Sequence, residues 1–228
     1  MQAARNLVIC CAGADSGLGL DIPKCLTPVL GRPLIHWQLD LARDFKNVTV
    51  VAGYKAAQVM YAIREKRPGV SFLLNHDYRN TSPLDFLAMG IADMREPFVY
   101  MDADLLVTSE AICLIQMALC PAIGIKQTYS DQPVCVEMGS GDLVRKVVGF
   151  TGELREYEWT GLAKLRPRDV RKAAGKTHLC QAIEQILPVD AVEIDCARIG
   201  TQQDYEEAQA WMRDQLECAG SERIAVAG

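Results

Sequence analysis

The chain of 228 residues lacks any apolar run of the eighteen or so residues that a membrane-spanning helix needs, although half of its residues are hydrophobic. Its first residues lead directly into a short apolar segment, so we expect no signal peptide. We therefore expect a cytoplasmic protein that has no membrane partner.

The chain also has no excess of basic residues. It contains 24 Lys and Arg against 29 Asp and Glu, a formal net charge of −5, and no basic stripe interrupts this balance. Binding to nucleic acid depends on cations that replace the counterions of the phosphate backbone. We therefore expect no nucleic-acid partner, and the sequence leaves the oligomeric state open.

Paired metal-ligand spacings are absent. The chain has nine cysteines, but none forms a metal-binding pattern, and the adjacent Cys10 and Cys11 fall in an apolar run. We interpret these two as small core residues in a reducing compartment. The three histidines are scattered along the chain and share no ligand spacing.

Apolar runs rich in Val and Ile alternate with helical patterns in the first half of the chain, which is typical of parallel strands joined by crossover helices. We find no repeat, low-complexity segment or interdomain linker. The fold class that we predict is α/β, a single domain around a doubly wound, mostly parallel sheet. The expected strands are Asn6–Ala12, Asn47–Gly53, Val70–Asn75 and Pro97–Met101, and the expected helices are Leu34–Arg43, Ala56–Arg64, Ser82–Met94 and Thr108–Leu119.

The second half has shorter strands separated by turns, which predicts a small β insertion in the same domain. We expect one domain over residues 1–218 and a flexible tail over 219–228. The expected strands here are Ala122–Lys126, Val134–Met138, Val144–Gly149, Trp159–Lys164 and Ala191–Asp195, with a helix inside Arg168–Leu187 and a last helix at Gln203–Cys218.

The segment from Val8 to Ile35 carries most of the functional information. A strand is followed by a loop with Gly13, Gly17 and Gly19, whose backbone N–H groups can approach an anion closely because no Cβ obstructs them. Lys24 follows at a distance from which its ammonium group can reach a bound phosphate.

The same glycines also fit the cofactor turn of a short-chain dehydrogenase. In that fold a helix starts directly from the glycines, whereas here Pro23 and Pro28 interrupt the following residues. Such an enzyme also needs a Tyr followed by a Lys four residues later, and no Tyr of this chain has one. The glycine loop therefore lacks both features that a dinucleotide-binding site of this kind requires.

The order of strand, glycine loop and Pro-Lys pair resembles the nucleotidyltransferases, and among them the phosphocholine cytidylyltransferase branch. The resemblance covers nearly the whole chain, in seven short pieces that follow the family's order. The pieces are Ala12-Gly13 with Pro23-Lys24, Gly31–Ile35, Val50–Tyr54, Asn75 with Tyr78–Ser82, Asp102–Asp104, Glu158–Leu162 and Ile199–Tyr205.

This resemblance implies a Rossmann-like nucleotidyltransferase fold and cytidylyl transfer from CTP to a small phosphate- or phosphonate-bearing acceptor, with release of pyrophosphate. An acceptor oxygen would attack the α-phosphorus in line, and positioning and charge neutralisation would supply the catalysis. Mg2+ is the implied cofactor. Two alternatives stay open, a catalytically impaired binding or regulatory module and a sugar-1-phosphate nucleotidyltransferase that uses UTP, GTP or dTTP.

Three positions depart from the family pattern. Asp15 and Gly17 stand where the loop of the family has a glycine and an arginine, and Arg198 stands where it has a metal-binding carboxylate. Arg198 could then face the phosphates in place of the missing loop arginine, with Asp195 as a substitute ligand. The candidate roles are therefore catalysis for Lys24 and Asp104, nucleotide binding for Ala12, Gly13, Ala14, Asn75, Thr81, Ser82, Asp102 and Arg198, acceptor binding for Glu158 and Trp159, and metal binding for Asp104 and Asp195.

Overall fold

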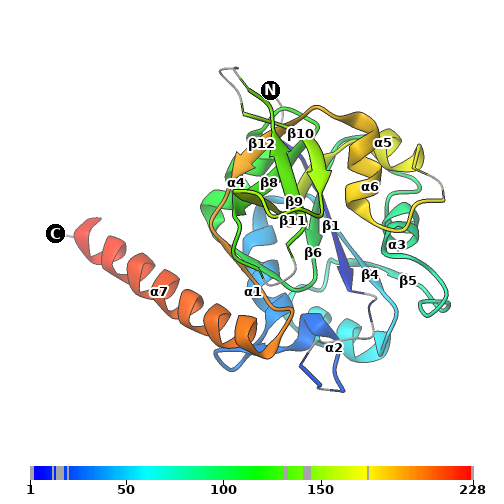
Figure 1. Ribbon diagram of the computed structural model, residues 1–228. Helices are drawn as coiled ribbons and strands as arrows, with labels where there is room; N and C mark the ends of the chain where they lie inside the picture. The colour runs from blue at the N-terminus through cyan, green and yellow to red at the C-terminus, as the bar shows by residue number, and fades with distance from the viewer. Residues whose placement is uncertain are drawn as a thin grey trace.

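The computed structural model describes residues 3–11, 13, 18–19, 21–130, 133–140, 145–173 and 175–226, with the backbone alone at 220–226. These residues build a nine-stranded sheet in the order β5-β4-β1-β6-β11-β8-β12-β10-β9, with helices on both faces (Figure 1). The prediction of a doubly wound α/β domain is confirmed.

One half of the sheet is parallel. Its strands are β1 (Asn6–Cys11), β4 (Asn47–Ala52), β5 (Ser71–Leu74) and β6 (Phe98–Asp102). β1 lies between β4 and β6 and runs parallel to both, and β4 also pairs with β5 in parallel. The central strands are buried on both faces, which explains their nearly continuous apolar sequences. All four strands therefore end at the same edge of the sheet.

The other half is mixed and begins with β11 (Tyr157–Leu165), which runs antiparallel to β6. Beyond it lie β8 (Ala122–Gln127), β12 (Val189–Glu193), β10 (Lys146–Thr151) and β9 (Cys135–Met138). Because β11 is antiparallel, its beginning lies at the edge of the sheet where β6 ends.

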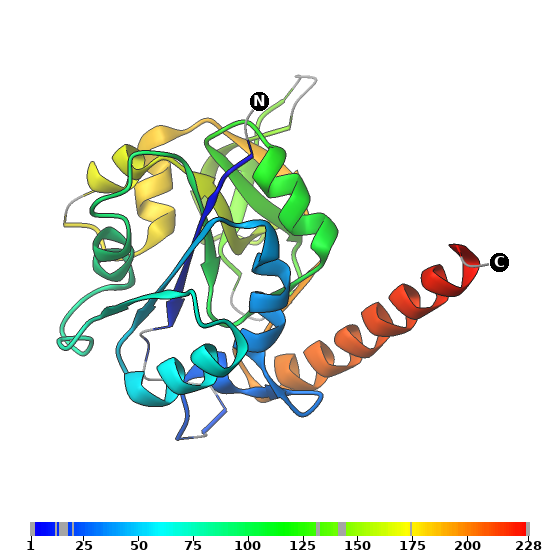
Figure 2. The same cartoon turned by 180° about the vertical axis from the view of Figure 1, so that it is seen from behind.

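Six helices cover the two faces of the sheet within the described chain. α1 (Leu34–Leu41), α2 (Ala56–Lys66) and α4 (Ser109–Met117) bury apolar residues in one core cluster. α3 (Pro83–Gly90), α5 (Pro167–Arg171) and α6 (Leu179–Ile183) contribute to the other cluster. Figures 1 and 2 show α3, α5 and α6 gathered on one side of the sheet.

The helix expected inside Arg168–Leu187 is two short helices, α5 and α6. Gly175 lies between them with φ of +84°, a conformation that ends a helix and that residues with a Cβ rarely adopt. Both helices bury apolar residues in the core cluster to which α3 also contributes.

The last helix, α7 (Gln202–Val226), extends away from the rest of the molecule in both views. Its start is capped by Thr201 and Asp204, because Thr201 Oγ1 accepts a hydrogen bond from Asp204 N at 3.2 Å while Asp204 Oδ2 accepts one from Thr201 N at 2.8 Å. The sequence predicts that this helix ends at Cys218. That prediction is wrong, because the helix continues through most of the segment that was expected to be a tail. No helix of the described residues is long and apolar enough to cross a membrane.

Two short strands outside the main sheet fix the position of Arg198. β13 (Cys196–Arg198) pairs antiparallel with β7 (Leu105–Val107), and this register places Arg198 opposite Leu105. Arg198 therefore lies next to the residues that follow β6.

Candidate functional site

A cleft of about 350 Å³ opens at the carboxyl ends of β1 and β6. This is the edge where ligands bind in doubly wound sheets. Lys24 enters it from the short 3-10 helix Lys24–Leu26, and Gly13 enters it from the loop after β1. The cleft is lined by Cys10, Cys11, Gly13, Lys24, Cys25, Pro83, Phe86, Tyr100, Asp102, Ala103, Asp104 and Arg198.

Two carboxylates form the floor of this cleft. Asp102 is the last residue of β6, and its Oδ1 accepts a hydrogen bond from the Tyr100 hydroxyl. Gln38 of α1 fixes the strand end, because its Nε2 donates to the carbonyls of Asp102 and Leu105 at 2.8 and 2.7 Å. Asp104 is only 6% exposed, and its Oδ1 is buried and accepts no hydrogen bond.

Two cations face these carboxylates. Nη2 of Arg198 lies 3.2 Å from Oδ2 of Asp102, and its Nε lies 3.4 Å from both carboxylate oxygens of Asp104. Nζ of Lys24 lies 3.3 Å from Oδ2 of Asp104. The guanidinium group of Arg198 thus joins the two carboxylates, and the four side chains together are neutral.

The electrostatics of this cluster follow from its burial. Burial raises the pKa of Asp102, and the positive charge of Arg198 opposes that rise. The carboxylate of Asp104, with a smaller contribution from Asp102, raises the pKa of Arg198 above its ordinary value, so the guanidinium keeps its charge. Burial also raises the pKa of Tyr100, which therefore acts as a hydrogen-bond donor to Asp102.

Gly161 of β11 makes room for the Asp102 carboxylate. Its φ is +91°, which residues with a Cβ rarely adopt. A Cβ at this position would stand 2.9 Å from Cγ of Asp102 and would meet Oδ2 at a still shorter distance. The glycine therefore allows the carboxylate to lie directly against β11.

These residues do not fit a divalent cation in the arrangement that the structure shows. Mg2+ prefers octahedral oxygen ligands, among them one or two carboxylates. In the described part of the chain no three His, Cys, Asp or Glu side chains come together as a metal site. The two carboxylates that could serve, Asp102 and Asp104, are instead joined by the guanidinium of Arg198.

A second cavity of about 190 Å³ adjoins the cleft and shares Pro83, Tyr100, Asp102 and Arg198 with it. Trp159 lines this cavity, so the structure places Trp159 next to the two cleft residues Asp102 and Arg198. His178, which the sequence alone does not connect with any site, lines it as well, together with Leu87, Val134, Leu179 and Cys180.

Glu158 does not share that cavity, contrary to the expectation that it acts beside Trp159. Successive residues of a strand point to opposite faces of the sheet. The Glu158 carboxylate is buried on the other face, 3.3 Å from Nζ of Lys126 and hydrogen-bonded by Oγ of Ser130 at 2.9 Å. Glu158 and Trp159 therefore have different surroundings, and acceptor binding by Glu158 stays a prediction.

The polar turn after β5 has its own internal partners. Asn75 Nδ2 donates to Thr81 Oγ1 at 2.7 Å, and Asn75 Oδ1 accepts from Asp77 N at 2.9 Å. Ser82 caps α3 through a reciprocal pair of hydrogen bonds with Asp85. None of Asn75, Thr81 and Ser82 lines the cleft, but α3 presents Pro83 and Phe86 to it.

Asp195 lies apart from the carboxylate pair. Its Oδ1 accepts a hydrogen bond from Trp211 Nε1 at 2.8 Å, and its Oδ2 accepts one from Gln215 Nε2 at 2.9 Å. These contacts join Asp195 to α7, and metal binding by Asp195 stays a prediction. Four further candidates from the sequence lie outside the described residues, namely Ala12, Ala14, Asp15 and Gly17.

Two residues of the site, Tyr100 and Gln38, have no place in the expectations from sequence, and Gly161 has no individual role there. Tyr100 lies two residues before Asp102, so strand alternation could have shown that both point to the same face. Gly161 was recognised only as part of a motif, because its contact with Asp102 depends on the β6–β11 register. Gln38 lies inside a helix, and no sequence signal connects it with the end of β6.

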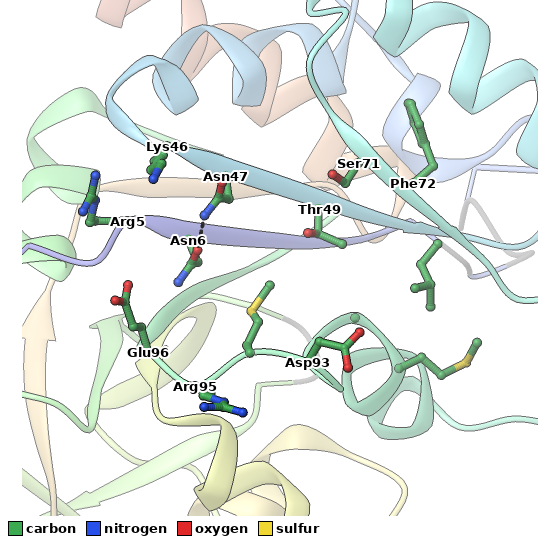
Figure 3. A pocket seen from close by; sticks show the side chains of 14 residues that line it. Arg5, Asn6, Lys46, Asn47, Thr49, Ser71, Phe72, Asp93, Arg95 and Glu96 are labelled. Carbon is green, nitrogen blue, oxygen red and sulfur yellow. Dashed lines mark hydrogen bonds between the residues drawn. The ribbon is translucent and has the colours of Figure 1, made fainter.

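A larger cavity of about 530 Å³ lies at the opposite edge of the sheet, where β1 and β4 begin (Figure 3). Asn6 and Asn47 meet there through a 2.8 Å hydrogen bond between their side chains. Its charged lining has both signs, with Arg5, Lys46 and Arg95 beside Asp93 and Glu96. No cluster of paired charges like that of Asp102, Asp104 and Arg198 is found among its described lining residues. It also lies at the edge opposite to the one where doubly wound sheets bind their ligands.

Comparison with known proteins gives consistent results. No family model matches the chain. The bifunctional protein GlmU of Burkholderia lata is 30% identical over 157 residues, which are 67% of this chain and 33% of that protein. The chain thus spans about a third of the length of this relative.

Two solved structures share the fold over nearly the whole chain. One is UDP-glucose pyrophosphorylase complexed with UDP-glucose, with a TM-score of 0.75, 14% identity, and coverage of 93% of this chain and 99% of that one. The other is CTP:phosphocholine cytidylyltransferase from Streptococcus pneumoniae, with a TM-score of 0.69, 18% identity, and coverage of 91% and 99%. At these identities the likeness establishes the fold.

Proposed function

We propose that this chain, which belongs to the nucleotidyltransferase family, transfers a cytidylyl group from CTP to a small phosphate- or phosphonate-bearing acceptor and releases pyrophosphate. The observation that carries the proposal is the cluster of Lys24, Arg198, Asp102 and Asp104 at the carboxyl ends of the parallel strands. Two cations held by a pair of carboxylates in an open cleft suit a ligand with several phosphates.

In this function the protein acts by positioning and by neutralising charge. Lys24 and Arg198 would face the triphosphate and reduce the repulsion between the α-phosphate and the attacking acceptor oxygen. Asp104 orients both cations, and Asp102 orients Arg198. The oxygen attacks the α-phosphorus in line, a new phosphorus–oxygen bond forms, and the bond to pyrophosphate breaks.

The cavity beside Trp159 is the place that we propose for the acceptor. It adjoins the cleft through Asp102 and Arg198, so an acceptor phosphate bound there would meet the same guanidinium group as the triphosphate. The indole ring would suit an aminoalkyl or quaternary ammonium cation on the acceptor. Its volume of about 190 Å³ favours a small acceptor.

Thermal-shift measurements with CTP, UTP, GTP, dTTP and ATP test the choice of base. A ligand at one hundred times its dissociation constant stabilises a protein by about 2.7 kcal/mol, which is a measurable rise in melting temperature. We expect the largest rise with CTP, because the turn from Asn75 to Ser82 resembles the cytidylyl branch. A larger rise with UTP or GTP would contradict this choice.

A second candidate is nucleotidyl transfer to a sugar 1-phosphate from UTP, GTP or dTTP. The fold match to a UDP-glucose pyrophosphorylase favours it. The same nucleotide panel separates the two candidates, and a pyrophosphate-release assay with phosphocholine and with glucose 1-phosphate as acceptors checks the result. Nucleotide binding without any pyrophosphate release would support a third candidate, a catalytically impaired binding module.

A further inference from the structure

Arg198 occupies the space between the two carboxylates of the cleft. Its Nη2 lies 3.2 Å from Asp102 and its Nε lies 3.4 Å from Asp104, so one guanidinium group contacts both acids. A divalent cation that used these two acids would have to stand in the same place. In this structure the guanidinium group of Arg198 occupies that position.

The charges of the cluster make exchange with a metal ion unfavourable. The carboxylates of Asp102 and Asp104 are matched by the guanidinium of Arg198 and the ammonium of Lys24. A divalent cation that entered would add two positive charges to a cluster whose charges already balance, and it would displace Arg198 from both acids.

The position of Arg198 in the fold is also fixed. Its backbone is held by the pairing of β13 with β7, and its side chain borders both the cleft and the cavity beside Trp159. The guanidinium group can therefore contact an anion in either space without leaving Asp102 and Asp104. Its fork of N–H donors matches the geometry of phosphate oxygens.

We infer that the guanidinium group of Arg198 takes the place of the divalent cation in this chain, so that phosphate groups are bound here independently of Mg2+. The inference rests on the proposed function for the identity of the ligand, a nucleoside triphosphate. It concerns the cation alone, and a test of the cation does not depend on which base is bound.

The first test uses the unmodified protein. Its melting temperature is measured with CTP in excess Mg2+ and with CTP in excess EDTA. We expect the same rise in both conditions. A rise that appears only with Mg2+ would overturn the inference and would leave the proposed function standing.

The second test measures the metal directly. Mn2+ takes the same oxygen ligands as Mg2+ and is detected by its electron paramagnetic resonance signal. We expect no bound Mn2+ on the unmodified protein without nucleotide. Bound Mn2+ that disappears in the Asp104→Asn variant would overturn the inference. If no nucleotide stabilises the protein in either condition, the proposed function fails, and the Mn2+ titration alone decides the inference.

The variant Arg198→Asp supplies an additional carboxylate and removes the competing cation. We expect it to bind Mn2+ and to bind CTP more tightly with Mg2+ than with EDTA, by about tenfold or more. The matched control is Arg155→Asp, an equally exposed arginine (40% against 38% for Arg198) that pairs with Glu153 away from the cleft. The control should behave like the unmodified protein.

If Arg198→Asp does not fold, Arg198→Gln removes the charge with a smaller change of the side chain. A gain of Mn2+ binding in this variant supports the inference. A folded Arg198→Gln or Arg198→Asp variant that binds no Mn2+ contradicts it, because Arg198 would then not be what excludes the metal.

Discussion

Two clusters of acids and bases in this molecule differ in how close their cations lie to the carboxylate oxygens. At Asp40 of α1, Arg32 and Lys66 each approach a different carboxylate oxygen at 2.7 Å. In the cleft the corresponding distances at Asp102 and Asp104 are 3.2 to 3.4 Å. The first cluster has short contacts at both oxygens, whereas the second leaves Oδ1 of Asp104 without a hydrogen bond.

This difference separates a structural cluster from a binding site. The Asp40 cluster joins α1 to α2 and to the segment before α1, and both carboxylate oxygens already have short contacts with cations. In the cleft the cations have longer contacts and border an open cavity, so they can still interact with a ligand. Matched substitutions in the two clusters should therefore affect different properties.

Lys24→Ala should give the largest effect. We expect turnover to fall about 100- to 1000-fold, because a charged donor to the transferring group is lost. The melting temperature should stay nearly unchanged, since a partly exposed lysine contributes little to folding. Pyrophosphate release and thermal unfolding measure the two properties.

The matched control for Lys24→Ala is Lys66→Ala, which removes the lysine of the Asp40 cluster. It should lower stability slightly and leave turnover unchanged. An equal loss of activity in the two variants would show that the cleft lysine has no special role.

Gly161→Ala should have the next largest effect on the cleft. The added Cβ collides with the Asp102 carboxylate, and the positive φ of this position disfavours any residue with a Cβ. We expect weaker CTP binding together with a loss of stability of about 1–3 kcal/mol. Isothermal calorimetry and chemical unfolding measure these effects.

Gly152→Ala serves as the comparison for Gly161→Ala, because a Cβ at Gly152 meets no atom within 4 Å. That variant should bind CTP normally. Unchanged CTP binding in Gly161→Ala would mean that the position of the Asp102 carboxylate does not matter for the ligand.

Asp40→Asn should have the smallest effect, and the effect should depend on pH. Burial alone would raise the pKa of Asp40, but Arg32 and Lys66 lower it to about 2. A carboxyl group whose folded pKa lies below its unfolded value of about 3.9 stabilises the fold above that value, and the stabilisation disappears as the pH falls towards 2.

At neutral pH the Asp40→Asn variant should therefore be less stable by on the order of 1 kcal/mol after allowance for solvent screening. The difference from the unmodified protein should shrink between about pH 4 and pH 2. Urea unfolding at a series of pH values measures it. A difference that stays constant over this range would exclude the ion pairs as its cause.

The sequence predicts the parallel half of the sheet well because its features are local. Short apolar runs between helical segments identify β1, β4, β5 and β6, and the acids after the last of these runs mark the ligand-binding edge. Lys24 is identified by the loop that precedes it, and the structure places it 3.3 Å from Asp104.

The remaining features of the site depend on contacts between distant parts of the chain. The opposite directions of Glu158 and Trp159 follow from strand alternation, but which face meets the cleft depends on the register of β11 with β6. The partners of Arg198 depend on the pairing of β13 with β7, which no local pattern predicts. The continuation of α7 beyond Cys218 likewise goes against the composition of that segment.

The long sequence separations between the residues of the cleft have a consequence for folding kinetics. The cleft joins Lys24 to Asp104 across 80 positions of sequence and Arg198 to Asp104 across 94, while Gly161 reaches Asp102 from a third region. Contacts of such long range form slowly, because the chain entropy of closing large loops opposes them. Ligand binding should therefore recover among the last signals during refolding, after the helices, whose contacts are local, have formed.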